Sequence, residues 1–169
     1  ASGTYVAPSA ATLNHKSYRP KLKAEPTAIE RAVEAMANGK RPVFYTGGGV
    51  INSGPKASQL LRELVRLTGF PVTSTLMGLG AFASDHPDWL GMLGMHGTYE
   101  ANMAMNRSDL IVAIGARFDD RVTGRLDAFA PEAKKIHIDI DRASINKIVP
   151  VDLGIVGDCA HVLEQLLAA

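Results

Sequence analysis

The amino-acid sequence predicts an α/β fold in which a doubly wound parallel sheet carries helices on both faces. Short, strongly apolar runs alternate with longer segments whose apolar residues recur at helical spacing. The run Leu110–Ile114 is typical of the first kind, because no polar residue interrupts it. Strands of this kind are buried on both faces, as in parallel sheets with right-handed crossovers. The predicted fold is therefore Rossmann-like, and chemistry is expected at the carboxyl ends of the strands.

The pattern predicts five strands and four longer helices. The strands cover residues 42–46, 70–75, 110–115, 135–141 and 153–157. The helices cover 27–40, a segment opened by Pro55, 98–108, and a closing segment that carries Val162, Leu163, Leu166 and Leu167. The glycine-rich segment from Gly78 to Gly97 is interpreted as mostly irregular.

Residues 1–25 differ from the rest of the chain. They lack a clear period and carry dispersed basic residues, so we expect a linker that leads in from a preceding domain. The alternative is an anion-binding patch made by Lys16, Arg19, Lys21 and Lys23. Residues 26–169 are predicted to form one domain.

Composition excludes several function classes. The formal net charge of +1 lacks the basic excess of a nucleic-acid footprint, and the longest apolar runs are far too short to span a bilayer. We therefore expect no nucleic-acid and no membrane partner. A single cysteine, Cys159, excludes an internal disulfide and favours a reducing cytoplasm. The five histidines lack metal-ligand spacing, so no metal site is expected.

A glycine-rich turn follows the first predicted strand. Gly47 and Gly49 in "TGGGVIN" would let backbone amides approach a phosphate at the start of the next helix. The spacing is G-x-G-x-x-N, with Asn52 where the dinucleotide fingerprint has a third small residue. A tight strand-to-helix turn explains the glycines about as well, and both interpretations stay open.

Two other glycine-rich segments are ambiguous. Residues 75–77 follow the second strand and are expected on exposed backbone at the edge of the sheet, although a packed loop fits equally well. In "GMLGMHGT", Met92 and Met95 are expected to fill gaps in the core. His96 is interpreted as a hydrogen-bonded structural residue.

Two aspartates follow later strands. Asp139 ends the fourth strand, where a dinucleotide fold places the acid that binds a ribose hydroxyl. Asp158 lies directly before the closing helix, so it is predicted to be an N-cap, with contact to a ligand as a second role.

Four charges are crowded into "IVAIGARFDDRVTG", directly after the strand 110–115. Arg117 is well placed to clamp a phosphate through two hydrogen bonds. Asp119, Asp120 and Arg121 could satisfy one another as a surface ion network, which would contribute little to stability. So many charges at the end of a central strand favour a ligand-binding role.

Taken in order, six motifs resemble a known family. They are "PVFYTGGG", "STLMGLGAF", "MLGMHGT", "GARFDDRVTG", "HIDID" and "GD". The sequence is similar to the central domain of the acetohydroxyacid synthase (acetolactate synthase) catalytic subunits, a thiamine-diphosphate enzyme family, from about Arg41 to Cys159. "RFDDRVTG" together with "LGMHGT" is specific to that family, whereas the glycine runs also fit other thiamine-diphosphate enzymes.

The resemblance implies that this domain holds FAD, whose role in the family is largely structural. The implied FAD contacts are Gly48, Thr75, Leu76, Leu93, Gly94, Met95, His96, Gly115, Ala116, Arg117, Phe118, Asp119, Asp139, Ile140, Asp158 and Cys159. A further FAD-binding arginine of some relatives corresponds to Asn14 here.

The resemblance also implies a part of the substrate channel. Met95, Asp120 and Arg121 would line the channel that leads to the thiamine, and Arg121 would meet the carboxylate of the second 2-keto acid. No catalytic residue is expected in this chain, because the activating glutamate belongs to the preceding domain in that family. The diphosphate and Mg²⁺ motif, G-D-G followed by N-N, belongs to the following domain. The chain alone is therefore expected to be inactive.

The parent enzyme implied by the resemblance is a cytoplasmic transferase that requires thiamine diphosphate and Mg²⁺. It joins two 2-keto acids after decarboxylating one, pyruvate with pyruvate or 2-ketobutyrate, in the first common step of branched-chain amino-acid biosynthesis. Its expected partners are the two other domains of the same polypeptide, further copies in a homodimer or tetramer, and a regulatory small subunit.

Two alternatives stay open. The first is a related thiamine-diphosphate enzyme of the pyruvate oxidase or glyoxylate carboligase type, in which the flavin could be redox-active. The second is a non-catalytic module that binds another adenine nucleotide.

Overall fold

The computed structural model describes Thr4, Val6 and residues 20–169. Within this part of the chain six parallel strands form one sheet, in the order β3-β2-β1-β4-β5-β6. The strands are β1 (Pro42–Thr46), β2 (Val72–Ser74), β3 (Trp89–Met92), β4 (Leu110–Ile114), β5 (Lys134–Asp139) and β6 (Leu153–Val156). The strand order changes direction between β1 and β4, which is where doubly wound sheets bind ligands. The predicted fold class is confirmed.

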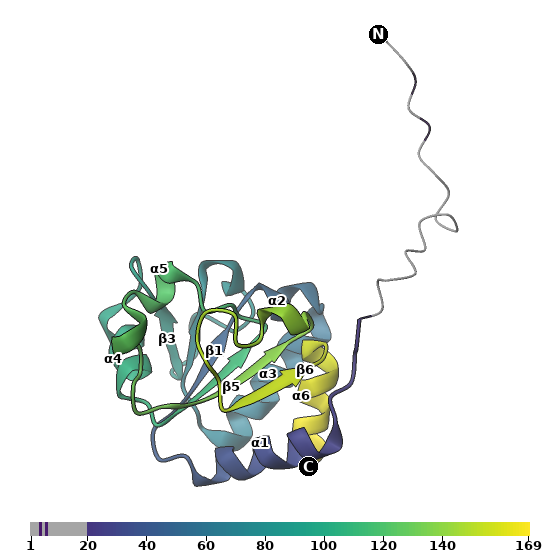
Figure 1. Cartoon of the computed structure of the whole chain (residues 1–169), viewed down its shortest axis with the longest axis horizontal. Coiled ribbons are helices and arrows are strands. Elements are labelled where there is room, and N and C mark those ends of the chain that lie inside the picture. The colour runs from purple at the N-terminus through teal and green to yellow at the C-terminus, as the bar shows by residue number, and fades with distance from the viewer. Residues whose placement is uncertain (1–3, 5, 7–19) are drawn as a thin grey trace.

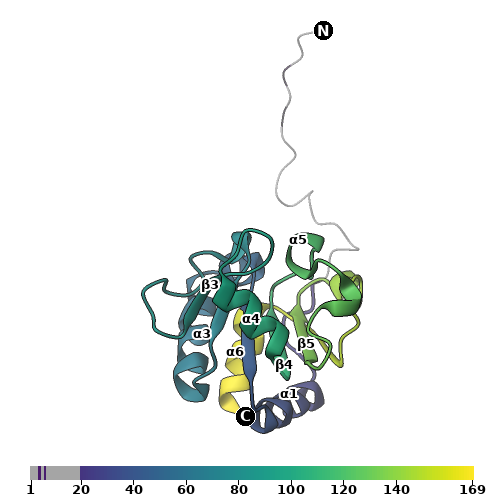
Figure 2. The same cartoon turned by 90° about the vertical axis from the view of Figure 1, so that its left-hand side faces the viewer.

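Helices cover both faces of the sheet (Figure 1). The longer helices are α1 (Pro26–Asn38), α3 (Pro55–Thr68), α4 (Tyr99–Arg107) and α6 (Cys159–Ala168), and the short ones are α2 (Gly48–Asn52) and α5 (Asp120–Thr123). Helices α1, α3 and α6 share one apolar core with the sheet. Helix α4, turned toward the viewer in Figure 2, covers the other face together with residues 129–133 and 149–151. No helix in the described ranges is long and apolar enough to cross a membrane.

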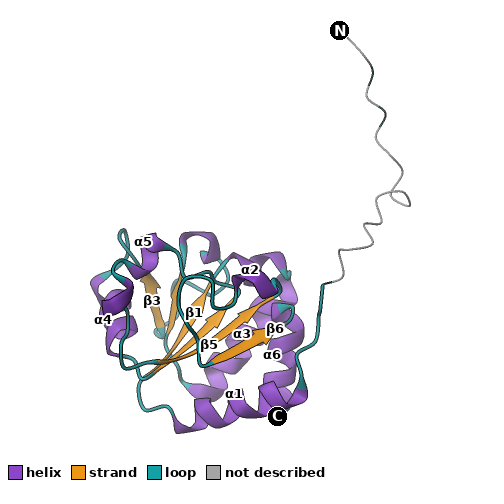
Figure 3. Ribbon diagram, viewed as in Figure 1, coloured by secondary structure: helices purple, strands orange, loops and turns teal. Residues whose placement is uncertain are grey.

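The central strands are buried on both sides, as their continuous apolar sequence predicts. In β4, Val112 and Ile114 pack with the core of α1, α3 and α6, while Ile111 and Ala113 pack on the α4 side. All four side chains are fully buried. Parallel pairing brings every carboxyl end to one edge of the sheet, the edge at which α2 and α5 lie in Figure 3.

Strand β1 has its predicted bounds, whereas the other four predicted strands are shorter than predicted, for local reasons. Phe70 and Pro71 precede β2, and a proline has no N–H to donate to a neighbouring strand. Strand β4 ends at Ile114 because Gly115 adopts a positive φ of 57°. Strand β5 ends at Asp139, and Asp141 instead accepts a hydrogen bond from the Ala143 amide in a following turn.

The interpretation of residues 78–97 as mostly irregular is wrong for Trp89–Met92, which forms the edge strand β3. Three of its four residues are only half-buried, and its pairing with β2 contains an irregularity between Val72 and Ser74. Gly91, with a φ of 91°, interrupts its apolar pattern. A short edge strand of this kind lacks the apolar run that revealed the central strands.

The end of the segment predicted as a linker packs on the domain. The Leu22 carbonyl accepts a hydrogen bond of 2.8 Å from the Asp158 amide. The Ala24 amide donates to Oε1 of Gln165 at 2.9 Å, and Ala24 itself is buried. The positions of Asn14, Lys16 and Arg19 lie outside the described residues.

The turn between β1 and α2 makes backbone contact with the end of β4. A Cβ atom added at Gly49 would lie 2.6 Å from the Gly115 Cα, and one added at Gly47 would lie 2.3 Å from the Gly115 carbonyl oxygen. Real Cβ atoms do not approach backbone atoms this closely. The glycines are therefore required because two backbone segments touch at the switch point of the sheet.

We predict that Gly49→Ala destabilises the domain by about 1–3 kcal/mol, the usual cost of overpacking a tight contact. The matched control is Gly48→Ala in the same short helix, whose added Cβ would meet the Met77 side chain at 3.2 Å and no backbone atom closer than 3.4 Å. Urea unfolding of the two variants measures the difference. Equal free energies of unfolding for the two variants would contradict this role of Gly49.

Candidate functional site

The candidate site is the carboxyl edge of the sheet, because each strand is followed there by residues of the predicted site. Gly48 follows β1, Thr75 and Leu76 follow β2, residues 93–96 follow β3, and residues 115–121 follow β4. Asp139 ends β5 and Ile140 follows it, and Asp158 and Cys159 follow β6. Residues from all parts of the sequence thus meet at one edge.

The glycine turn after β1 does not offer its amides to a ligand in the way the sequence suggested. The Gly47 amide donates to the Ile114 carbonyl at 3.1 Å, and the Gly49 amide donates to the Gly115 carbonyl at 2.9 Å. Both donors are therefore used within the fold. The structure supports the tight turn, because the amides of Gly47 and Gly49 themselves are not available to a phosphate.

The segment after β4 alternates between buried and exposed residues. Ala116 and Phe118 are buried, and the Phe118 ring packs on the Tyr45 ring at a centroid distance of 5.6 Å. Burial and the nearby Asp119 carboxylate raise the pKa of Tyr45, so its hydroxyl stays protonated and donates to the Arg117 carbonyl at 2.8 Å. This anchor fixes the backbone of Arg117 while its side chain is exposed. Arg117 is thus presented to the outside of the edge.

The alternative interpretation of Asp119, Asp120 and Arg121, a surface ion network, does not hold for the described residues. No ion pair joins any two of Arg117, Asp119, Asp120 and Arg121 among the ion pairs of the described residues. Asp119 instead caps α5 by accepting a hydrogen bond from the Arg121 amide. The pKa of Asp119 lies below its ordinary value, because its carboxylate hydrogen-bonds with the Asp120 side chain and with that amide. The positive charges of Arg117 and Arg121 lower it further. The guanidinium groups remain available to an anion.

A small cavity adjoins this segment. It has a volume of about 40 Å³ and is lined by Arg117, Phe118, Asp119, Ser144, Lys147 and Ile148. Lys147 adds a second positive charge beside Arg117. The local chemistry suits a phosphate group.

The loop after β3 docks on α5 and brings two predicted channel residues together. The Met95 amide donates to the Arg121 carbonyl at 2.9 Å. Gly94, with a φ of 91°, lies so close that an added Cβ would be 2.4 Å from the same carbonyl oxygen. The Met95 side chain is 65% exposed, so the expectation that it fills the core is wrong. Met92 is half-buried.

Sequence reasoning missed Asn102, which holds this loop from α4. Its side-chain oxygen accepts a hydrogen bond from the Gly94 amide at 2.9 Å, and its nitrogen donates to the Gly94 carbonyl at 3.1 Å. An asparagine on a helix carries no local signal for such a contact. Only the proximity of α4 to the loop gives it this role.

Residues 75–77 lie on exposed backbone, as one of the two interpretations predicted. The Thr75 hydroxyl accepts a hydrogen bond from the Gly78 amide and caps a single turn. The Leu76 and Met77 side chains are 69% and 74% exposed. Other large apolar side chains are also exposed after strand ends, and they are Ile51, Leu79, Met95, Ile140 and Ile148. An exposed apolar surface of this kind is typical of a binding site or an interface.

Asp158 is the N-cap of α6, as predicted. Its carboxylate accepts hydrogen bonds from the amides of Ala160 and His161 and, at 2.7 Å, from the Ser53 hydroxyl. Partial burial alone would raise the pKa of Asp158, but the hydrogen bonds from His161, Ser53 and the backbone hold it below its ordinary value. The carboxylate is therefore largely engaged within the protein.

Several of the implied FAD contacts have buried side chains. Leu93, Ala116, Phe118 and Cys159 are each exposed by less than 5%. Burial, with the charges of Asp158 and Asp139 adding to it, raises the pKa of the Cys159 thiol to about 12, so the thiol is inert near neutral pH. Any contact of these four residues with a ligand would be made by the backbone.

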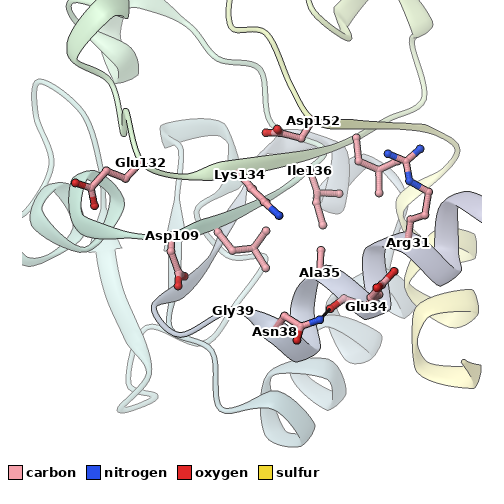
Figure 4. A pocket seen from close by; sticks show the side chains of 12 residues that line it. Arg31, Glu34, Ala35, Asn38, Gly39, Asp109, Glu132, Lys134, Ile136 and Asp152 are labelled. Atoms are coloured by element: carbon pink, nitrogen blue, oxygen red, sulfur yellow. Dashed lines mark hydrogen bonds between the residues drawn. The ribbon is translucent and has the colours of Figure 1, made fainter.

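Two larger open cavities lie at the opposite, amino edge of the sheet. One has a volume of about 600 Å³ and lies between α1 and the amino ends of β4, β5 and β6 (Figure 4). Its Asp109 accepts hydrogen bonds from the amides of Lys40 and Arg41, and its Asp152 accepts one from the Lys135 amide. The other, of about 610 Å³, lies between Gly39–Pro42, the segment 68–71 and α4. Parallel sheets bind ligands at the carboxyl edge, so these cavities are not the candidate site.

The described part of the chain holds no group of three or more histidine, cysteine, aspartate or glutamate residues that could bind a metal ion.

The fold defines a class: a doubly wound α/β domain whose candidate site lies at the carboxyl ends of its strands. Residues 29–166 match the model of the central domain of thiamine pyrophosphate enzymes. The chain belongs to that family.

Within this family, the chain is similar in sequence to acetolactate synthases. The chain is 48% identical over 163 residues to the acetolactate synthase isozyme 3 large subunit of Escherichia coli, covering 96% of the chain and 28% of the relative. It is 51% identical over 162 residues to the probable acetolactate synthase large subunit of Methanocaldococcus jannaschii, covering 96% and 27%. It is 52% identical over 151 residues to an acetolactate synthase of Mycobacterium bovis, covering 89% and 24%. The chain thus spans about a quarter of the length of these relatives.

Proposed function

We propose that the chain holds FAD along the carboxyl edge of its sheet, as the central domain of an enzyme of the acetolactate synthase type. The observation that carries this proposal is the placement of Arg117 and Asp139 at one edge of the sheet: Arg117 follows β4, and Asp139 ends the neighbouring strand β5. A guanidinium suits the diphosphate of a dinucleotide, and a carboxylate suits its ribose hydroxyls. The exposed apolar side chains of Leu76, Met77 and Met95 offer a surface for the flavin.

The residues at this edge fit such a ligand chemically. Arg117 and Lys147 supply positive charge beside a small cavity, and Asp139 supplies an acceptor at the end of the adjacent strand. The buried residues Ala116 and Phe118, like Gly115 before them, would contribute backbone groups rather than side chains. The flavin serves a structural purpose in this proposal and contributes no step of the reaction.

The proposed parent enzyme condenses two 2-keto acids in the cytoplasm, on the path to branched-chain amino acids. Thiamine diphosphate with Mg²⁺, held by other domains of a longer polypeptide, supplies the decarboxylation chemistry. The names of the similar proteins favour this function over an oxidase or a carboligase. Homo-oligomers and a regulatory small subunit are part of the same proposal.

Within this enzyme Arg121 is proposed to orient the second 2-keto acid. A guanidinium grips a carboxylate through two hydrogen bonds and so fixes the direction in which the substrate carbonyl faces. The exposed Met95 side chain belongs to a loop bonded to the Arg121 carbonyl, which supports a shared channel wall. Asp120, adjacent in sequence and also exposed, would line the same channel. Arg117 and Asp119 would face the flavin, so one segment would serve two ligands.

The FAD proposal is tested by the double substitution Arg117→Ala and Asp139→Ala. Loss of one charged hydrogen-bonding partner weakens binding by about 10- to 100-fold, so the pair should lower FAD affinity by at least that factor. Flavin fluorescence titration measures it. The control is Arg31→Ala with Glu34→Ala, which removes one charge of each sign at the opposite edge. Unchanged FAD affinity in the Arg117/Asp139 variant, relative to the control, would refute the assignment.

The substrate proposal is tested by Arg121→Ala in the longer polypeptide. The KM for the second 2-keto acid should rise by about 10- to 100-fold, as expected for a lost charged partner, while decarboxylation of the first persists. Arg121→Lys should recover part of the loss, because it restores charge without the two-pronged geometry. Arg125→Ala is the control, since Arg125 is an exposed arginine paired with Asp127 nearby. An unchanged dependence on the second substrate would assign Arg121 a structural role instead. The 169-residue chain alone should show no turnover.

A further inference from the structure

His137 is a buried polar side chain without a partner. It lies in β5 between Ile136 and Ile138, and only 1% of its surface is exposed. Among the described residues, neither Nδ1 nor Nε2 of its ring has a hydrogen-bond partner. Leaving a buried polar group unpaired is destabilising, so a native protein that keeps one usually has a reason.

The ring lies beneath the segment that presents Arg117. It packs edge-on against the Phe118 ring at a centroid distance of 5.2 Å, and Phe118 packs in turn on Tyr45 and Phe129. These neighbours are aromatic and offer the imidazole little hydrogen bonding. A phenylalanine at position 137 would fit the same aromatic cluster, so packing alone does not account for a histidine.

One charged group, Asp139, and one backbone group, that of Ala116, lie near the ring, and neither is placed to form a hydrogen bond with it within the described ranges. The Asp139 Oδ2 atom is 3.8 Å from the His137 Nε2 atom, which is beyond hydrogen-bond length. The other oxygen of Asp139, Oδ1, accepts a hydrogen bond from the Asp141 amide at 2.8 Å. No hydrogen bond to Oδ2 is present among the described residues, and the Asp139 side chain is only 13% exposed. An unpaired donor and an unpaired acceptor thus face each other across a short gap.

We propose that His137 is a positioning residue for the nucleotide: in the loaded site its Nε2–H donates to Asp139 Oδ2 and fixes that carboxylate toward a ribose diol. This inference rests on the proposed function. Closing the gap needs a movement of about 1 Å, because an N–H···O bond spans about 2.9 Å. Oδ1 is already held by the Asp141 amide, so a second bond at Oδ2 would leave the carboxylate a single orientation.

The protonation state of His137 suits a neutral donor. Burial lowers the pKa of His137, although the Asp139 carboxylate and the Ala116 backbone oppose it. The neutral ring carries one N–H and donates one hydrogen bond. No proton need be taken from solvent when the ligand binds.

The first test compares His137→Phe with the unchanged chain. The phenylalanine keeps the aromatic cluster and removes both unpaired nitrogens, so the Tm should be unchanged or higher. FAD affinity, measured from amide shifts in an NMR titration, should nevertheless fall by about tenfold, the usual effect of one lost hydrogen bond. His137→Gln, which keeps an N–H donor, should lose less. Unchanged FAD affinity in His137→Phe would overturn the inference.

The second test asks whether His137 acts through Asp139. In an Asp139→Asn background, His137→Phe should have no further effect on FAD affinity, because the carboxylate it orients is gone. A tenfold loss in both backgrounds would overturn the inference and leave the FAD proposal intact. If the unchanged chain binds no FAD, the proposed function fails and this inference fails with it.

A spectroscopic measurement on the unchanged residue keeps the proposal testable if His137→Phe does not fold. The Nε2 resonance of His137 should shift when FAD is added, because the nitrogen gains a hydrogen-bond acceptor, and it should stay in place in Asp139→Asn. A side chain that serves only the packing of the core would give no such shift. The absence of a shift in the unchanged chain with FAD bound would overturn the inference.

Discussion

The rest of the structure depends on a contact between two stretches of backbone at the centre of the sheet. The turn after β1 touches the end of β4, and no Cβ atom fits at Gly47 or Gly49. The amides of these glycines donate to the carbonyls of Ile114 and Gly115, so the contact is hydrogen-bonded as well as close. This contact fixes the position at which β4 ends, and therefore the point at which the charged segment 116–121 leaves the sheet.

After β4, buried and exposed residues alternate along the carboxyl edge: Ala116 and Phe118 are buried, and Arg117 between them is exposed. Phe118 is held in the aromatic cluster beneath the sheet edge, and the Tyr45 hydroxyl holds the Arg117 carbonyl. The loop after β3 is hydrogen-bonded to the same segment at the Arg121 carbonyl, and the Asn102 side chain of α4 accepts a second hydrogen bond from this loop. The buried core thus fixes the backbone of this edge, while charged and apolar side chains on the same backbone stay exposed. Such an arrangement suits the binding of a ligand or of a neighbouring domain.

The sequence predicted correctly those features that depend on residues adjacent in the chain. The apolar runs predicted all the buried strands, and Asp158 before the apolar closing segment predicted a helix cap, because both signals reside in adjacent residues. The prediction from sequence failed for features that depend on contacts between residues distant in the chain. The edge strand β3 has too little burial to show a pattern, and the glycines of the first turn serve contact with β4 rather than exposure of amides. Asn102 and His137 gain their roles only from neighbours distant in sequence. The charges of 117–121 were recognised from the sequence, but their lack of mutual ion pairs was not predictable, since it depends on the turn of α5.

We propose above all that the carboxyl edge holds FAD, and a residue-by-residue map of the binding surface is the sharpest test of this claim. An ¹⁵N-labelled sample of the chain titrated with FAD should show amide shifts at Gly48, Thr75, Gly94, Arg117 and Ile140, after the ends of five different strands. Amides at the opposite edge, including Asn38, Lys134 and Asp152, should not move. Titration with NAD and ADP under the same conditions would separate a flavin site from a general adenine-nucleotide site. Shifts confined to the amino-edge cavity, or equal responses to all three nucleotides, would contradict the claim.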